Sequence, residues 1–168
     1  DGLPEGIHVA NLESAWEREP ELLERYLTRV AGFEEHAFTA LNTAFLRHGA
    51  VVHVAKEMVV DRPIHLLFVS DANAAKGASH PRNLVVVERN AKATVIETYA
   101  SIGDATYFTN AVTEVVGAQE ATLNHNKTIQ VRHARDWNVA ALDVRGVDWR
   151  PYRGVAEIVA GGPPCQPF

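Results

Sequence analysis

The sequence is poor in the features that mark several common classes of protein. Its 168 residues include a single cysteine, which excludes an internal disulfide and favours a reducing compartment such as the cytoplasm. Lys and Arg number 16 against 21 Asp and Glu, so the net charge of −5 gives no basic footprint for nucleic acid. Apolar runs such as Ile64–Val69 have the length of a strand and are too short to cross a bilayer.

What remains is typical of a globular domain. Hydrophobic residues make up 46% and charged residues 22% of the chain, and its length is enough for one domain with a real core. The chain begins with Asp1, without a charged and then apolar leader, and ends inside a motif. We take these features as signs of a piece of a larger protein.

The N-terminal part has a helical pattern. Pro20 suits a first helical turn and Gly32 a helix end. The apolar residues between them recur at three- and four-residue spacing: Leu22, Leu23, Tyr26, Leu27 and Val30. A second short helix is predicted over Glu34–Phe45, with Phe38, Leu41 and Phe45 on one face. Residues 1–48 are therefore predicted to form a small helical region.

From Gly49 onward the hydrophobic period changes to two, which predicts a mainly β fold. The predicted strands are Val51–Ala55, Ile64–Ser70, Asn83–Glu88, Ala93–Tyr99, Thr109–Val116 and Ala121–Gln130. Several begin alike, with small residues leading into alternating ones, which is a weak internal repeat. This pattern suits a solenoid of β-rungs, and a β-sandwich would also produce it.

Four blocks within residues 3–130 carry a family resemblance: LPEGIHVANL, ALNTAFLRHGAVVHVAKEMVVDRPIHLLFVS, HPRNLVVVERNAKATVIETYAS and YFTNAVTEVV. Together they closely resemble the SufB/SufD family of iron–sulfur cluster assembly proteins, on its SufD-like side. The resemblance implies a right-handed parallel β-helix over 49–130, preceded by the helical region 1–48. It also implies a cytosolic, non-catalytic scaffold component without a resident cofactor, with SufB-type and SufC-type proteins as partners.

The polar residues of this part suggest no catalytic or metal site. The spacing of the histidines His48, His53, His65 and His80 does not match a zinc site, and we expect them to be half-exposed or hydrogen-bonded. We expect solvated strand ends at Arg82, Arg89 and Lys92, and an outer sheet face carrying Glu88, Glu97 and Glu114. No metal ligand is predicted.

The last part of the chain, residues 131–168, resembles a different protein family. EIVAGGPPCQPF and the lead-in LDVRGVDWRPYRG resemble the catalytic segment of DNA cytosine-5 methyltransferases. In that family the cysteine at the position of Cys165 attacks C6 of a flipped-out cytosine, so that C5 can take a methyl group from S-adenosylmethionine. The acid partner and the glycine-rich cofactor loop of that family are not found in this sequence.

Two functions from different classes follow. The first is a SufD-like scaffold fragment that is not an enzyme, which accounts for about three quarters of the chain. The alternative is a DNA (cytosine-5)-methyltransferase fragment with Cys165 as nucleophile, and only this alternative brings nucleic acid and S-adenosylmethionine into play. A chimera with a junction near residues 128–136 is compatible with the first function, and we prefer the two together.

Overall fold

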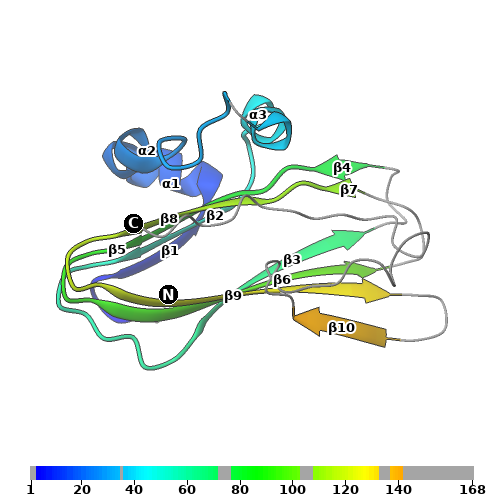
Figure 1. Ribbon diagram of the computed structural model, residues 1–168. Helices are drawn as coiled ribbons and strands as arrows, with labels where there is room; N and C mark the ends of the chain where they lie inside the picture. The colour runs from blue at the N-terminus through cyan, green and yellow to red at the C-terminus, as the bar shows by residue number, and fades with distance from the viewer. Residues whose placement is uncertain (1–2, 35, 72–76, 103–107, 133–136, 142–168) are drawn as a thin grey trace.

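The computed structural model describes residues 3–34, 36–71, 77–102, 108–132 and 137–141. The elements are, in chain order, β1 (Ile7–Asn11), α1 (Leu12–Arg18), α2 (Pro20–Tyr26), α3 (Ala37–Ala44), β2 (Ala50–Val54), β3 (Ile64–Asp71), β4 (Ala78–Ser79), β5 (Arg82–Val87), β6 (Lys92–Ile102), β7 (Phe108–Thr109), β8 (Val112–Gly117), β9 (Thr122–Arg132) and β10 (Trp137–Ala141). The helices gather beside one sheet (Figure 1). None of the helices in the described ranges is both long and apolar enough to span a membrane.

The mainly β prediction is confirmed. The six predicted strands correspond to β2, β3, β5, β6, β8 and β9, and the two predicted helices correspond to α2 and α3. The sequence interpretation missed β1 and α1, which lie within the predicted helical region, and the short strands β4 and β7. It also missed β10. These elements have two to seven residues each, too few for a period to show.

The strands form three sheets through which the chain passes repeatedly in the same order. β2, β5 and β8 are parallel neighbours, as are β3, β6 and β9, and β4 pairs with β7 (Figure 1). The register shows the repeat directly, because Ile64 pairs with Val95 and Val95 pairs with His125. The chain therefore returns to the same sheet after about 30 residues, which is the physical basis of the weak internal repeat. Each passage through the sheets is called a rung: the first comprises β2, β3 and β4, the second β5, β6 and β7, and the third β8 and β9.

Two antiparallel strands close opposite ends of this arrangement. β1 pairs with β2 at the first rung of one four-stranded sheet, and β10 pairs with β9 at the last rung of the other. β10 is linked to β9 through residues 133–136, and β1 leads directly into α1. In the described ranges, the outer edges of β3 and β8 have no paired strand.

The main core lies between the two four-stranded sheets. Inward residues of β2 and β5 meet those of β3 and β6, among them Val52, Val54, Val85, Val87, Ile64, Leu66, Ala93 and Val95. The other face of the first sheet packs on helices, where Leu84 and Val86 contact Leu12 and Leu23. All six residues of β5 are buried, because this strand is covered on both faces. The consecutive apolar residues of β5, Leu84–Val87, are typical of a strand that is buried on both faces.

The first two helices have local start signals. The Asn11 side chain accepts a hydrogen bond from the Ser14 N–H at 2.7 Å and so caps α1. Pro20 occupies the start of α2, as predicted, where the missing N–H costs nothing. Leu12 and Leu23, one from each helix, are fully buried against the sheet.

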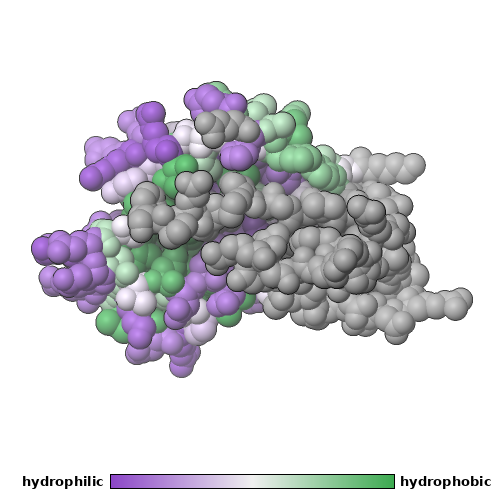
Figure 2. Space-filling view, viewed as in Figure 1, coloured by the Kyte–Doolittle hydropathy of each residue, from purple (hydrophilic) through white to green (hydrophobic). Residues whose placement is uncertain are grey.

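The third helix has its polar side buried and its apolar side exposed. Thr39 and Asn42 are buried, whereas the predicted apolar face of Phe38, Leu41 and Phe45 is exposed. The Asn42 amide donates to the carbonyls of Pro81 at 2.9 Å and Asn110 at 2.8 Å, which fixes the orientation of α3. Figure 2 shows the resulting apolar surface where α3 lies.

We predict that Gly49→Ala destabilises the protein. The backbone at Gly49 lies against Arg82, and an added Cβ would overlap the Arg82 carbonyl group. The expected loss is about 1–3 kcal/mol in the free energy of unfolding, measured by urea denaturation. Gly117→Ala is the matched control, because its Cβ would meet Ala121 at an ordinary 3.8 Å. Equal stabilities for the two variants would contradict this packing.

Candidate functional site: two buried polar clusters

The first buried cluster joins the helical region to the sheet through Arg82 and Glu114. The prediction that these residues lie on solvated surface was wrong, because both side chains are 0% exposed. The Arg82 Nε donates to the Glu114 carboxylate at 2.7 Å, and its other nitrogens reach Asn42 Oδ1 at 3.2 Å and the Ala31 carbonyl at 3.0 Å. Arg82 is the first residue of β5, and Glu114 lies on β8. Both side chains are on the face of the sheet that packs against the helices.

The loop after α2 completes this cluster with backbone groups. The Glu114 carboxylate accepts hydrogen bonds from the N–H groups of Thr28 at 2.8 Å, Val30 at 2.9 Å and Ala31 at 3.1 Å. Thr28 has a positive φ of 64°, and its N–H is among those that point at the carboxylate. One side chain of the third rung therefore holds the N-terminal helices in place.

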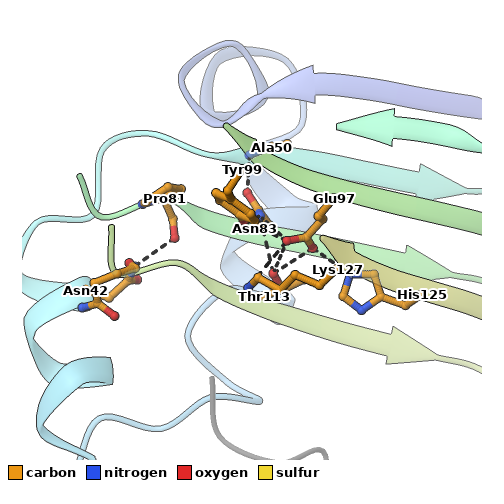
Figure 3. A network of polar contacts seen from close by, with 10 residues as sticks. Asn42, Ala50, Pro81, Asn83, Glu97, Tyr99, Thr113, His125 and Lys127 are labelled. Atoms are coloured by element: carbon orange, nitrogen blue, oxygen red, sulfur yellow. Dashed lines mark hydrogen bonds and ion pairs between the residues drawn. The ribbon is translucent and has the colours of Figure 1, made fainter. Parts of the chain in front are cut away.

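The second buried cluster surrounds Glu97 between the two large sheets (Figure 3). The prediction that Glu97 lies on an outer face was wrong, since its side chain is 0% exposed. Its oxygens meet five groups: Tyr99 Oη at 2.8 Å, Thr113 Oγ1 at 2.8 Å, His125 Nε2 at 2.8 Å, Asn83 Nδ2 at 3.3 Å and Lys127 Nζ at 3.7 Å. The partners come from β5, β6, β8 and β9.

The register explains why these residues converge. Glu97 pairs with Lys127 on β9 and with Leu66 on β3. The same inward-facing position is therefore occupied by leucine in the first rung, glutamate in the second and lysine in the third. The neighbouring position reads Ile64, Val95 and His125. At these two positions the side chains therefore change from apolar at the first rung to polar at the third. His125 and Lys127 are 23% and 30% exposed, so the cluster reaches solvent at β9.

The surroundings keep Glu97 ionised and Tyr99 protonated. Burial by itself would raise the pKa of Glu97, but the hydrogen bond with His125, the charges of Lys127 and His125, and the Tyr99 hydroxyl lower it to about 2. Burial, and then the neighbouring Glu97 carboxylate, raise the pKa of Tyr99 well above its ordinary value. The phenol thus remains a hydrogen-bond donor.

Both clusters have the character of satisfied structural networks. Within the described ranges, every buried side-chain nitrogen and oxygen has a hydrogen-bond partner. Within the same ranges no group of three or more His, Cys, Asp or Glu could hold a metal ion. Chemically, the Glu97 cluster offers a fixed anion beside two basic side chains.

Three of the four histidines, His53, His65 and His80, are hydrogen-bonded, as predicted, and the fourth is exposed. His53 Nε2 lies 3.0 Å from Glu88, and this contact, opposed by partial burial, lowers the pKa of Glu88. His65 Nε2 lies 2.9 Å from Thr98 Oγ1. His80 is half-buried and stacks on Phe45, with ring centroids 4.9 Å apart. His48 is exposed.

Three further predicted residues can be placed. Arg89 and Lys92 are exposed, in agreement with the prediction, and Glu88 is half-buried directly after the last residue of β5. Cys165 lies outside the described residues, so its proposed role stays a prediction.

The comparisons with known proteins match both parts of the described fold. The family model "SufBD protein N-terminal region" matches residues 1–66, and "SUF system FeS cluster assembly, SufBD core domain" matches residues 68–146. The chain belongs to the SufB/SufD family. This identification confirms the resemblance found in the sequence. The predicted domain limits at 48 and 130 stay predictions.

Curated relatives agree with the family. An iron–sulfur cluster assembly SufBD family protein of Synechocystis is 32% identical over 142 residues, covering 80% of this chain and 30% of the relative. The iron–sulfur cluster assembly protein SufD of Bacillus subtilis is 27% identical over 124 residues, 71% of this chain and 28% of the relative. The chain thus spans less than a third of the length of these SufB/SufD relatives.

A relative of another kind also matches. The type II methyltransferase M.Eco47II of Escherichia coli is 37% identical over 76 residues, which cover 45% of this chain and 18% of that enzyme. This match is shorter than those to the SufB/SufD proteins.

Sequence reasoning missed most members of the buried clusters: Asn42, Asn83, Tyr99, Thr113, His125 and Lys127. The signal that could have found some of them is the 30-residue offset, which aligns Glu97 with Lys127 and Val95 with His125. Alternation within β6 alone divides its residues into two sets without saying which set faces inward.

We predict that Glu97 makes stability depend on acid pH. Its folded pKa of about 2 lies below the ordinary 4.5, so its contribution is complete above about pH 4.5 and is lost as pH falls towards 2. The contribution is on the order of 3 kcal/mol. Glu97→Gln should flatten the dependence of the free energy of unfolding on pH between 4.5 and 2, measured by urea denaturation.

The control for this experiment is Glu57→Gln, which changes an exposed carboxylate with a side chain 64% accessible. It should keep the pH slope of the unmodified protein. An unchanged slope in Glu97→Gln would show that the cluster does not hold the carboxylate ionised.

Proposed function

We propose that this chain acts as a non-catalytic, SufD-like scaffold component of SUF-type iron–sulfur cluster assembly. The observation that carries the proposal is the match of two successive SufBD family regions to residues 1–146, in the order in which the helices and then the stacked rungs occur. The satisfied buried clusters support a structural role for the polar interior. In this role the cluster being assembled is cargo.

The proposed architecture is a right-handed parallel β-helix fragment. Its support is the passage of the chain through three sheets in constant order, with parallel neighbours about 30 residues apart. We propose a cytoplasmic location and no resident cofactor. SufB-type and SufC-type proteins are the proposed partners, because the relatives named SufBD belong to the SUF system.

The test is co-purification. The affinity-tagged chain, co-expressed with a SufB-type and a SufC-type protein, is expected to retain at least the SufB-type protein through size-exclusion chromatography. The same chain carrying Gly49→Ala, which we expect to be destabilised, should retain less, and the chain carrying Gly117→Ala should retain the same amount. Elution of the tagged chain without either protein would contradict the proposed partners.

The alternative function is that of a DNA (cytosine-5)-methyltransferase fragment with Cys165 as nucleophile and S-adenosylmethionine as cofactor. The similarity to M.Eco47II favours it. We expect no covalent adduct when the chain meets DNA containing 5-fluorocytosine and S-adenosylmethionine, measured by denaturing electrophoresis. An adduct that forms with the unmodified chain and is lost in Cys165→Ser would establish the alternative and overturn the non-catalytic assignment.

A further inference from the structure

Two histidines lie side by side on the first two strands of the sheet that carries the helices. His8 of β1 and His53 of β2 are directly opposite in the antiparallel ladder, so their side chains project from the same face. Their rings are stacked, with centroids 6.0 Å apart and planes 26° from parallel. The His8 side chain is 58% exposed and that of His53 18%, so the pair is accessible from solvent on the His8 side.

One carboxylate faces both rings. Glu19 lies between the last residue of α1 and the first residue of α2, at the corner of the two helices. Its Oε1 is 3.6 Å from His8 Nδ1, and its Oε2 is 3.8 Å from His53 Nδ1. Both distances are longer than a hydrogen bond. The Nδ1 atoms of the two rings therefore lie beside the same negatively charged group without being bonded to it.

A second carboxylate fixes which nitrogen of His53 can bind a ligand. His53 Nε2 lies 3.0 Å from Glu88 Oε1, and the other oxygen of Glu88 accepts from the Lys56 N–H at 3.0 Å. An ionised carboxylate only accepts hydrogen bonds, so Nε2 carries the proton and Nδ1 of the neutral ring keeps its lone pair. A carboxylate on the far nitrogen is the usual support of a histidine that binds a metal ion through its other nitrogen.

A cation is the ligand that suits this arrangement, because the lone pair of His53 Nδ1 and the Glu19 carboxylate are both acceptors. Imidazole nitrogen suits Ni²⁺, Cu²⁺ and Zn²⁺, whereas Mg²⁺ and Ca²⁺ prefer oxygen ligands. Metal–nitrogen bonds of about 2 Å require the two nitrogens to lie within about 4 Å of each other. Rotation of the exposed His8 ring can bring its Nδ1 to that distance.

We propose that His8 and His53 chelate one divalent transition-metal ion through their Nδ1 atoms, with the Glu19 carboxylate as a nearby counter-charge. The described ranges contain no group of three or more His, Cys, Asp or Glu side chains that could hold a metal ion, so water supplies the remaining ligands. The ion exchanges with solvent and is not a resident cofactor. This inference does not depend on the proposed function.

The experiment titrates the whole chain with Ni²⁺ by isothermal calorimetry at about pH 7.5, where protons compete little for the imidazole nitrogens. We expect one Ni²⁺ per chain, which a tenfold excess of Mg²⁺ does not displace. The position of the ion is read from amide NMR signals, because paramagnetic Ni²⁺ broadens the signals of nearby nuclei. Signals of residues 7–9 and 52–54 should broaden first.

Protein variants test the two ligands and their support. His8→Gln removes one nitrogen from an exposed position and should weaken Ni²⁺ binding about tenfold or more. The matched control is His65→Gln, which changes an exposed histidine that pairs with Ile96 in the ladder and should bind Ni²⁺ unchanged. Glu88→Ala should weaken binding about tenfold, and Glu88→Gln, which still accepts from Nε2, should restore most of the loss.

Three results would overturn the proposal. The first is no binding of Ni²⁺ to the unmodified chain. The second is equal affinity of the unmodified chain and His8→Gln. The third is binding that persists in His8→Gln and is lost in Cys165→Ser, which would assign the ion to the cysteine. The NMR measurement needs no variant, and first broadening of signals away from residues 7–9 and 52–54 would likewise contradict the site.

Discussion

The buried ion pair of Arg82 and Glu114 is the interaction on which the rest of the structure depends. A pair of charges removed from water gains little unless its remaining donors and acceptors are satisfied. Here the carboxylate also holds three backbone N–H groups of the loop after α2, and the guanidinium reaches α3 and the same loop. The second rung, the third rung and the helical region are therefore joined at one point.

The Glu97 cluster fills the space between the two large sheets where the inward side chains become polar. A stack of parallel rungs needs inward side chains that fill the space between two sheets, and the first rung does this with apolar residues. By the third rung the same positions carry His125 and Lys127, and the Glu97 carboxylate contacts both side chains from the rung between. The ionised carboxylate and the protonated Tyr99 thus extend the core towards a polar end.

Sequence patterns predicted the elements better than the polar contacts. The change of period at Gly49 located six strands. Arg82, Glu97 and Glu114 were misplaced because a charged residue in an alternating strand is usually assigned to solvent. The register between rungs, which decides the inward face, depends on residues about 30 positions away. The exposed apolar side of α3 was likewise hidden, since it depends on Asn42 bonding to two distant carbonyls.

The most direct test of this account is a double-mutant cycle on Arg82 and Glu114. The free energy of unfolding is measured for Arg82→Met, Glu114→Gln, and both together. If the pair joins helices and rungs, each single change costs about 3–5 kcal/mol, and the double change costs less than their sum by at least about 1.5 kcal/mol. Costs that add within about 0.5 kcal/mol would contradict the account, since they would show two independent side chains.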